Sequence, residues 1–166
     1  MFFYITSGTY SFLEKIKEKY SKENMVLMHN LNNAQLIHET PKKSLFQSPR
    51  KYTVIDSAGE FTNKGFISCI YIPVRDEDRP VFEYRIENRA QIISREDGFL
   101  ALRVLRPLKQ DTYIVMSMWS NKEAYEKWIE SPSFKQSQYK SNATNVFSGP
   151  SYITTYQVGK EEDEEN

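Results

Sequence analysis

The stretch FISCIYIPV at residues 66–74, followed by RPVFEYRIENRAQII at residues 79–93, decides the fold class of this chain. The first stretch is apolar and rich in β-branched residues, which predicts a strand. The second has apolar residues at helical spacing and opens with Pro80, where a helix tolerates a missing N–H, so it predicts one helix. A strand followed by a helix begins an α+β unit.

The rest of the second half completes this unit. Its expected elements are hairpin strands over 99–106 and 112–119, a helix from a Ser120–Glu123 capping box to about Glu130, a short helix over 131–140, and a strand over 152–158. The order β-α-β-β-α-α-β is that of the split βαβ, or ferredoxin-like, arrangement. In it, helices cover one face of an antiparallel sheet.

The first half shows a similar order. Its expected elements are a strand over 2–6, a helix over 10–20, a strand pair over 24–30 and 34–39, and one more strand over 51–56. Two such sheets can cover each other by closing into a barrel. We therefore predict an α+β fold of two ferredoxin-like halves, 1–62 and 63–158, whose antiparallel sheets close into a β-barrel with helices outside. A disordered acidic tail over 159–166 follows.

Composition limits the classes of function. The 22 basic and 22 acidic side chains, once the acidic tail is set aside, leave a weakly basic body that does not resemble a nucleic-acid surface. No apolar run is long enough for a membrane span, and the N-terminus lacks the pattern of a secretory signal. The single cysteine, Cys69, is typical of a reducing compartment, so we expect a cytoplasmic protein.

Few residue types for catalysis or metal binding are available. There is no phosphate-binding glycine loop, CxxC or HExxH motif. The only histidines, His29 and His38, are too few for a His-rich metal site and offer little for a Ser-His-Asp or Cys-His site.

Two arginines flank the apolar face of the expected helix 79–93. Arg85 and Arg89 fall on the same side of this face. Their guanidinium groups either pair with nearby carboxylates such as Glu83 and Glu87, or stand at the lip of an apolar cavity and bind the carboxylates of a flat ligand.

Two further positions are candidates for a pocket or for core packing. Trp128 and Gln138 lie on the inner sides of consecutive short helices, and Gln138 follows the inward Phe134 by one helical turn. On the strand 66–74, alternation places Ser68 and Ile70 on one largely apolar face.

Several stretches resemble a known family: YITSGTYSFLEKI (4–16), HETPKKSLFQSPRKYTVIDSAGEF (38–61), GFISCIYIPVRDEDRPVFEYRIENRA (65–90), DGFLALRVLRPLKQDTYIVMSMWSNKEAYEKWIESPSF (97–134) and FSGPSYITTY (147–156). They resemble the antibiotic-biosynthesis-monooxygenase superfamily, in particular the haem-degrading monooxygenases of Gram-positive bacteria that carry an added N-terminal half. They are also similar to the related staphylococcal target of RNAIII-activating protein.

The resemblance implies a haem site. The family uses an Asn on the first strand of the module, a Trp on the helix after the hairpin, and a His on the next short helix as iron ligand. The Trp position is Trp128, whereas the Asn and His positions hold Ile70 and Gln138. Ser68 could substitute for the Asn as a hydrogen-bond donor, and Tyr139 or Gln136 could substitute for the His as iron ligand. Arg85 falls where the family binds a haem propionate, and Arg89 lies one helical turn later. Trp119 and Phe134 would form part of the wall of the haem pocket.

The implied function is haem degradation, in which haem is both cofactor and substrate and is opened by O₂ with electrons from a reductase or another donor, releasing iron. One alternative is a catalytically impaired relative with a haem-binding, stress or regulatory role. Another is a cofactor-free monooxygenase of a quinol-like aromatic. A monomer with a barrel closed within the chain is expected first, and a homodimer is the alternative.

Overall fold

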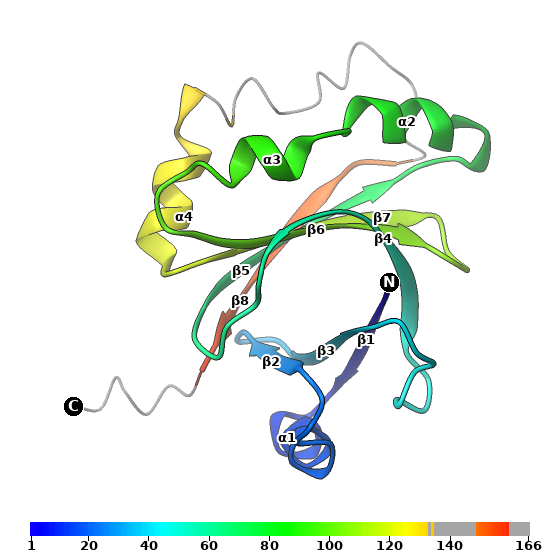
Figure 1. The fold of residues 1–166 in the computed structure, drawn as a ribbon, viewed down its shortest axis with the longest axis vertical. Coiled ribbons are helices and arrows are strands. Elements are labelled where there is room, and N and C mark those ends of the chain that lie inside the picture. The colour runs from blue at the N-terminus through cyan, green and yellow to red at the C-terminus, as the bar shows by residue number, and fades with distance from the viewer. Residues whose placement is uncertain (133, 135–148, 160–166) are drawn as a thin grey trace.

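The protein is an eight-stranded antiparallel barrel with helices on its outer surface (Figure 1). The computed structural model describes residues 1–132, 134 and 149–159. In chain order the elements are β1 (Phe2–Gly8), α1 (Tyr10–Lys19), β2 (Met25–His29), β3 (Ala34–Thr40), β4 (Arg50–Gly59), β5 (Gly65–Pro73), the 3₁₀ turn η1 (Asp76–Asp78), α2 (Arg79–Arg85), α3 (Arg89–Ile93), β6 (Phe99–Pro107), β7 (Thr112–Trp119), α4 (Lys122–Ile129) and β8 (Tyr152–Val158).

The strand order confirms two ferredoxin-like halves that close into a barrel within one chain. Neighbouring strands run β4-β1-β3-β2 in the first half and β8-β5-β7-β6 in the second, so the two halves have the same order. The halves meet along β4 and β6 over a long register, and along β2 and β8 at only two residue pairs, Met28 with Val158 and His29 with Gln157. The predicted boundary after residue 62 lies in the connection between β4 and β5.

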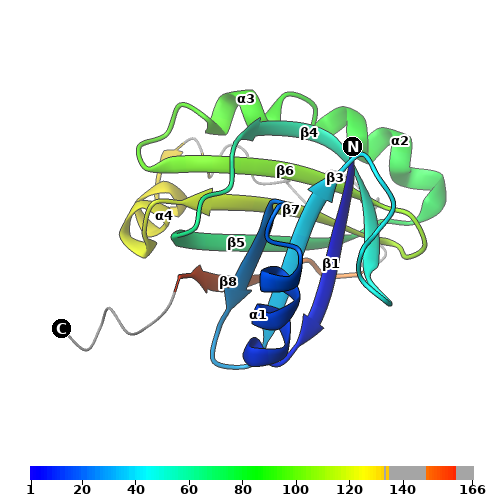
Figure 2. The same ribbon diagram turned by 60° about the horizontal axis from the view of Figure 1, so that its bottom comes forward.

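Alternation along β5 separates two cores. Ile67, Cys69 and Tyr71 face the barrel interior, where they join a core contributed by both halves. Phe66 and Ile72 face outward and pack beneath α2, α3 and α4. A third, smaller core lies under α1 on the first half, and Figure 2 shows α1 lying against β1, β2 and β3, well away from the other helices.

The predicted single helix over 79–93 is wrong. The chain instead forms α2 and α3, separated at Asn88, whose φ of 66° is left-handed. Asn tolerates this conformation better than most residues. The Asp56 carboxylate on β4 accepts a hydrogen bond from the Ala90 N–H at 3.0 Å, which satisfies a donor at the start of α3. The break therefore depends on a contact between the two halves.

Two smaller expectations also need correction. The cap of α4 is Asn121, whose side chain accepts from the Ala124 N–H at 2.8 Å, and not the expected Ser120–Glu123 box. The strand expected over 51–56 continues to Gly59 after a bulge between Val54 and Asp56. The strand expected over 152–158 is confirmed, whereas most of the helix expected over 131–140 lies outside the described residues.

No helix in the described part of the chain is long and apolar enough to cross a membrane.

Candidate functional site

An aromatic cluster covers the outer face of β5 and β7 at the end nearest α4. Trp128 of α4 stacks on Trp119 of β7, with ring centroids 4.9 Å apart, and Phe134 meets Trp128 edge-on at 4.6 Å. Tyr125, one turn before Trp128, packs on Phe66 of β5 at 5.3 Å. We call these five residues the aromatic cluster. The structure thus brings three predicted site residues, Trp119, Trp128 and Phe134, into direct contact.

Ile70 lies on the same face, beside this cluster. It packs against the core that lies beneath α2, α3 and α4. Its neighbour on β8 is Ile153, whose side chain is 48% exposed. Ser68, two residues before Ile70, is fully buried and donates a hydrogen bond to the Tyr125 hydroxyl at 3.2 Å. The position that corresponds to the family Asn therefore carries a half-buried apolar side chain, and Ser68 and Tyr125 provide a pair of hydroxyls on the same side of the sheet.

A groove of about 540 Å³ opens over β8 next to the aromatic cluster. Its floor includes Phe66, which belongs to the cluster, together with Ile153 and Thr155 of β8. Lys122, at the start of α4, lines it as well, and its ammonium lies 3.8 Å from the Glu126 carboxylate. No aspartate or glutamate is among the described lining residues, so the groove suits an anionic, partly apolar ligand.

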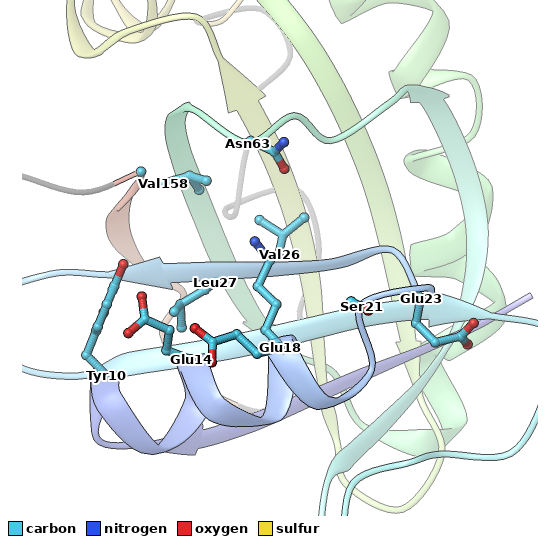
Figure 3. Close-up of a pocket in the computed structure, with 11 residues that line it drawn as sticks. Tyr10, Glu14, Glu18, Ser21, Glu23, Val26, Leu27, Asn63 and Val158 are labelled. Atoms are coloured by element: carbon cyan, nitrogen blue, oxygen red, sulfur yellow. The ribbon is translucent and has the colours of Figure 1, made fainter.

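Two other pockets have the opposite character. One of about 480 Å³ lies between α1 and β2 and is lined by Glu14, Glu18 and Glu23 (Figure 3). Figure 3 shows Glu14 and Glu18 reaching from α1 toward Leu27 and Val26. Another of about 530 Å³ lies at the break between α2 and α3, where Asp56, Glu83 and Glu87 contribute carboxylates and Arg106 one cation. Because both pockets contain several carboxylates, neither suits an anionic ligand as well as the groove over β8.

The two predicted arginines differ in their surroundings. Arg85 is exposed and makes no ion pair with any described residue, so it does not pair with Glu83. Glu83 instead accepts two hydrogen bonds from Arg106 and a short one from the Tyr113 hydroxyl. The Arg106 bonds lower the pKa of Glu83. Arg89 is half-buried in the first turn of α3.

The remaining candidates lie elsewhere or outside the described residues. Gln136, Gln138 and Tyr139 fall outside them. Cys69 faces the barrel interior, and burial raises the pKa of its thiol to about 12, so it is not available as a thiolate. The described residues contain no group of three His, Cys, Asp or Glu side chains placed to hold a metal ion.

Sequence reasoning missed Tyr125, Lys122 and Thr155. A signal for Tyr125 was present, because it lies three residues before Trp128 and so shares its helix face. Lys122 and Thr155 carried no such signal, since only the pairing of β8 with β5 brings them to the groove.

Residues 66–140 match the family model for antibiotic biosynthesis monooxygenase. The second half of the chain is therefore similar to the antibiotic biosynthesis monooxygenase (ABM) family. It contains the aromatic cluster, Ile70, Lys122 and the arginines, whereas β8, which completes the groove, follows the matched residues.

Two similar proteins match the first half of the chain as well. A Staphylococcus epidermidis protein named signal transduction protein TRAP is 28% identical over 156 residues, which cover 94% of this chain and 93% of that protein. A Listeria monocytogenes protein named heme-degrading monooxygenase is 26% identical over 153 residues, covering 92% of each chain.

Solved structures show the same fold. A major regulator of staphylococcal pathogenesis superposes with a TM-score of 0.87 at 24% identity, covering 96% of this chain and all of that one. LmHde, a heme-degrading enzyme from Listeria monocytogenes, superposes with a TM-score of 0.76 at 23% identity, with coverage of 96% and 100%.

Proposed function

We propose that this protein binds haem against the outer face of β5 and β8, beside the aromatic cluster, and degrades it as a monooxygenase. The observation that carries the proposal is the groove over β8, which combines an apolar floor with a cation and no described carboxylate next to Trp128. The similarity to the ABM family and the relative named heme-degrading monooxygenase support it. We further propose that the protein works in the cytoplasm.

The described residues fit the porphyrin. The ring is flat, apolar and edged by two carboxylates, so it would lie on Ile70, Ile153 and Phe66, with Trp128 closing one side. Lys122, which lines the groove, would bind a propionate, and Arg85, which makes no ion pair with any described residue, would be the candidate for the other. When bound, haem supplies the iron that activates O₂, and an external donor such as a reductase supplies the electrons.

A hemin titration of the full chain tests the proposal. A Soret band that shifts and saturates at an equimolar ratio is expected. Lys122→Glu should weaken hemin binding about tenfold, because it reverses the charge in the groove. Lys127→Glu makes the same change on an exposed face of α4 outside the groove, so it should bind hemin like the wild type. Equal affinities in the two variants would exclude this groove.

A second function, binding or regulation without turnover, is favoured by one specific observation. Position 70 is an isoleucine, which donates no hydrogen bond, and position 138 is a glutamine, a far weaker iron ligand than histidine. Relatives named signal transduction protein TRAP fit this candidate. Adding ascorbate to the hemin complex separates the two: loss of the Soret band indicates degradation, and a stable band indicates binding alone.

A further inference from the structure

One edge of β2 has no strand beside it in the described part of the chain. β2 pairs with β3 along its whole length, from Met25 to His29. On its other side it pairs with β8 only at Met28 and His29. The segment Met25–Leu27, which we call the β2 edge, therefore has a described strand on one side only. An edge of this kind can accept a further extended segment through backbone hydrogen bonds.

Gly159 explains why the pairing between β2 and β8 stops. In the register of these strands, Gly159 would be the residue opposite Leu27. Its φ of 105° is a conformation that favours glycine, and it takes the chain out of the extended conformation of β8. Its carbonyl oxygen accepts a hydrogen bond from Nε2 of His29 at 3.0 Å. β8 therefore ends before its pairing reaches the β2 edge.

The pocket between α1 and β2 lies along the β2 edge. Val26 and Leu27 of this edge line it, and so do Asn63 and Val158 of the second half of the chain. Figure 3 shows Asn63 and Val158 across the pocket from Val26. The pocket therefore provides space next to the strand edge, where an added segment would lie.

The lining of this pocket is acidic. Glu14 and Glu18 reach into it from α1, and Glu23 lines it just before β2, whereas Lys17 is the one cation among its described lining residues. Leu27 faces α1, where it joins the core under that helix. Because neighbouring residues on adjacent strands point to the same face, alternate residues of an added segment would point toward these carboxylates.

We propose that the β2 edge binds an extended segment of a partner protein that carries lysine or arginine at alternate positions. Backbone hydrogen bonds to β2 hold this segment, and its cations lie against the carboxylates of the pocket. Residues 161–165 of the chain itself are all acidic, so their charge does not fit the pocket. A second copy of the chain would bring the same carboxylates to its own β2 edge. No described residue lines both this pocket and the groove over β8, so the proposal is independent of haem binding.

Peptide titrations of the full chain, followed by fluorescence anisotropy, test the chemistry of the segment. The probe is a labelled peptide of alternating lysine and valine, which should show saturable binding that weakens with added salt. In one control peptide glutamate replaces lysine, and in another the backbone amides are N-methylated and cannot donate to a strand. Both should bind about tenfold more weakly than the probe. Equal binding of either control, or no saturable binding of the probe, would overturn the proposal.

Variants of the protein test the place of binding. Glu14→Gln combined with Glu18→Gln should weaken probe binding about fivefold, because two carboxylates of the pocket are lost. Glu123→Gln combined with Glu130→Gln makes the same charge change on exposed positions of α4 and its end, so it should leave the affinity unchanged. Hydrogen exchange of the β2 edge should slow when the probe binds. Equal affinities in the two double variants, or unchanged exchange at the β2 edge, would also overturn the proposal.

Discussion

Arg103 on β6 forms a two-point ion pair with Glu39 on β3 inside the barrel: Nε donates to Oε2 at 2.7 Å and Nη2 to Oε1 at 3.1 Å. The pair links the second half of the chain to the first, because β3 and β6 belong to different halves. Arg103 is 5% exposed and also donates to the carbonyl oxygens of Ala58 and Gly59. It therefore connects three strands of the barrel.

Removing Arg103 should destabilise the barrel. Arg103→Met leaves the Glu39 carboxylate and two carbonyl groups without their donor, so we expect a loss of about 3 kcal/mol in the free energy of unfolding. Urea unfolding followed by circular dichroism measures it. Lys122→Ala breaks an exposed pair on α4 and should cost less than about 1 kcal/mol. Equal losses would contradict the structural role of the buried pair.

Stability should fall on mild acidification because of His38. Its side chain is 2% exposed, its Nε2 lies 3.2 Å from a Glu23 carboxylate oxygen, and its Nδ1 has no partner among the described residues. Burial lowers the pKa of His38, and Glu23 only partly offsets this. The unfolded chain therefore takes up a proton first, near pH 6.5, and stability is lost as the pH falls through the folded pKa.

Two variants check the His38 prediction by urea unfolding between pH 7.5 and about 5. His38→Gln should flatten the pH dependence in this range. Glu23→Gln should steepen it, because it removes the carboxylate that raises the pKa of His38. An unchanged slope in both variants would show that another group controls stability in this range.

The stability of the protein should depend on which residue occupies the left-handed position 88 between α2 and α3. Asn88→Gly keeps the backbone conformation without steric cost and should change the free energy of unfolding by less than about 0.5 kcal/mol. Asn88→Ala should cost about 1 kcal/mol, since alanine is strained at this φ. Thermal melts of the pair measure the difference. A more stable alanine variant would indicate that the chain prefers one continuous helix.

The propionate role proposed for Arg85 can be separated from general charge effects. Arg85→Ala should weaken hemin binding about fivefold but leave the binding of hemin dimethyl ester unchanged, because the ester carries no carboxylates. Arg95→Ala removes another exposed cation of the same domain and should alter neither affinity. A similar loss with the ester would mean that Arg85 acts through the fold.

Restoring the family residues should increase turnover. Ile70→Asn adds a donor on the outer face of β5, where we propose that haem binds, and Gln138→His adds an imidazole at the position that corresponds to the iron ligand of the family. We expect faster loss of the Soret band with ascorbate in the double variant than in the wild type. Ile72→Asn, on the same face but fully buried, should instead destabilise the protein without faster loss. A double variant no faster than the wild type would show that the ungapped alignment is wrong at these positions.

Regular elements were predictable from local pattern. The strand Tyr152–Val158 is confirmed at both ends, because alternating β-branched and aromatic residues specify a strand over seven positions. The helix at Tyr10 is likewise confirmed, since its apolar residues recur every four positions and Thr9 caps it. Such features depend on neighbours within one turn or one strand.

Features that depend on distant contacts were not predictable. Ser120 and Asn121 are both good capping residues, but the Ser120 N–H is bonded to the Gly98 carbonyl, so the helix starts one residue later. Glu83 had two arginines nearby in sequence, yet Arg106 from β6 reaches it instead. In both cases a partner far along the chain competes with a local one.

The sequence by itself determined the order of the strands along the chain, the two ferredoxin-like halves and the faces that Trp128 and Ile70 occupy, because periodicity and order are local properties of the chain. Only the tertiary structure decided that β8 brings Thr155 and Ile153 beside Ser68 and Ile70, and that the groove next to them contains no described carboxylate. The physical reason is register: pairing between β5 and β8 selects which side chains share a face, and no single strand contains that information.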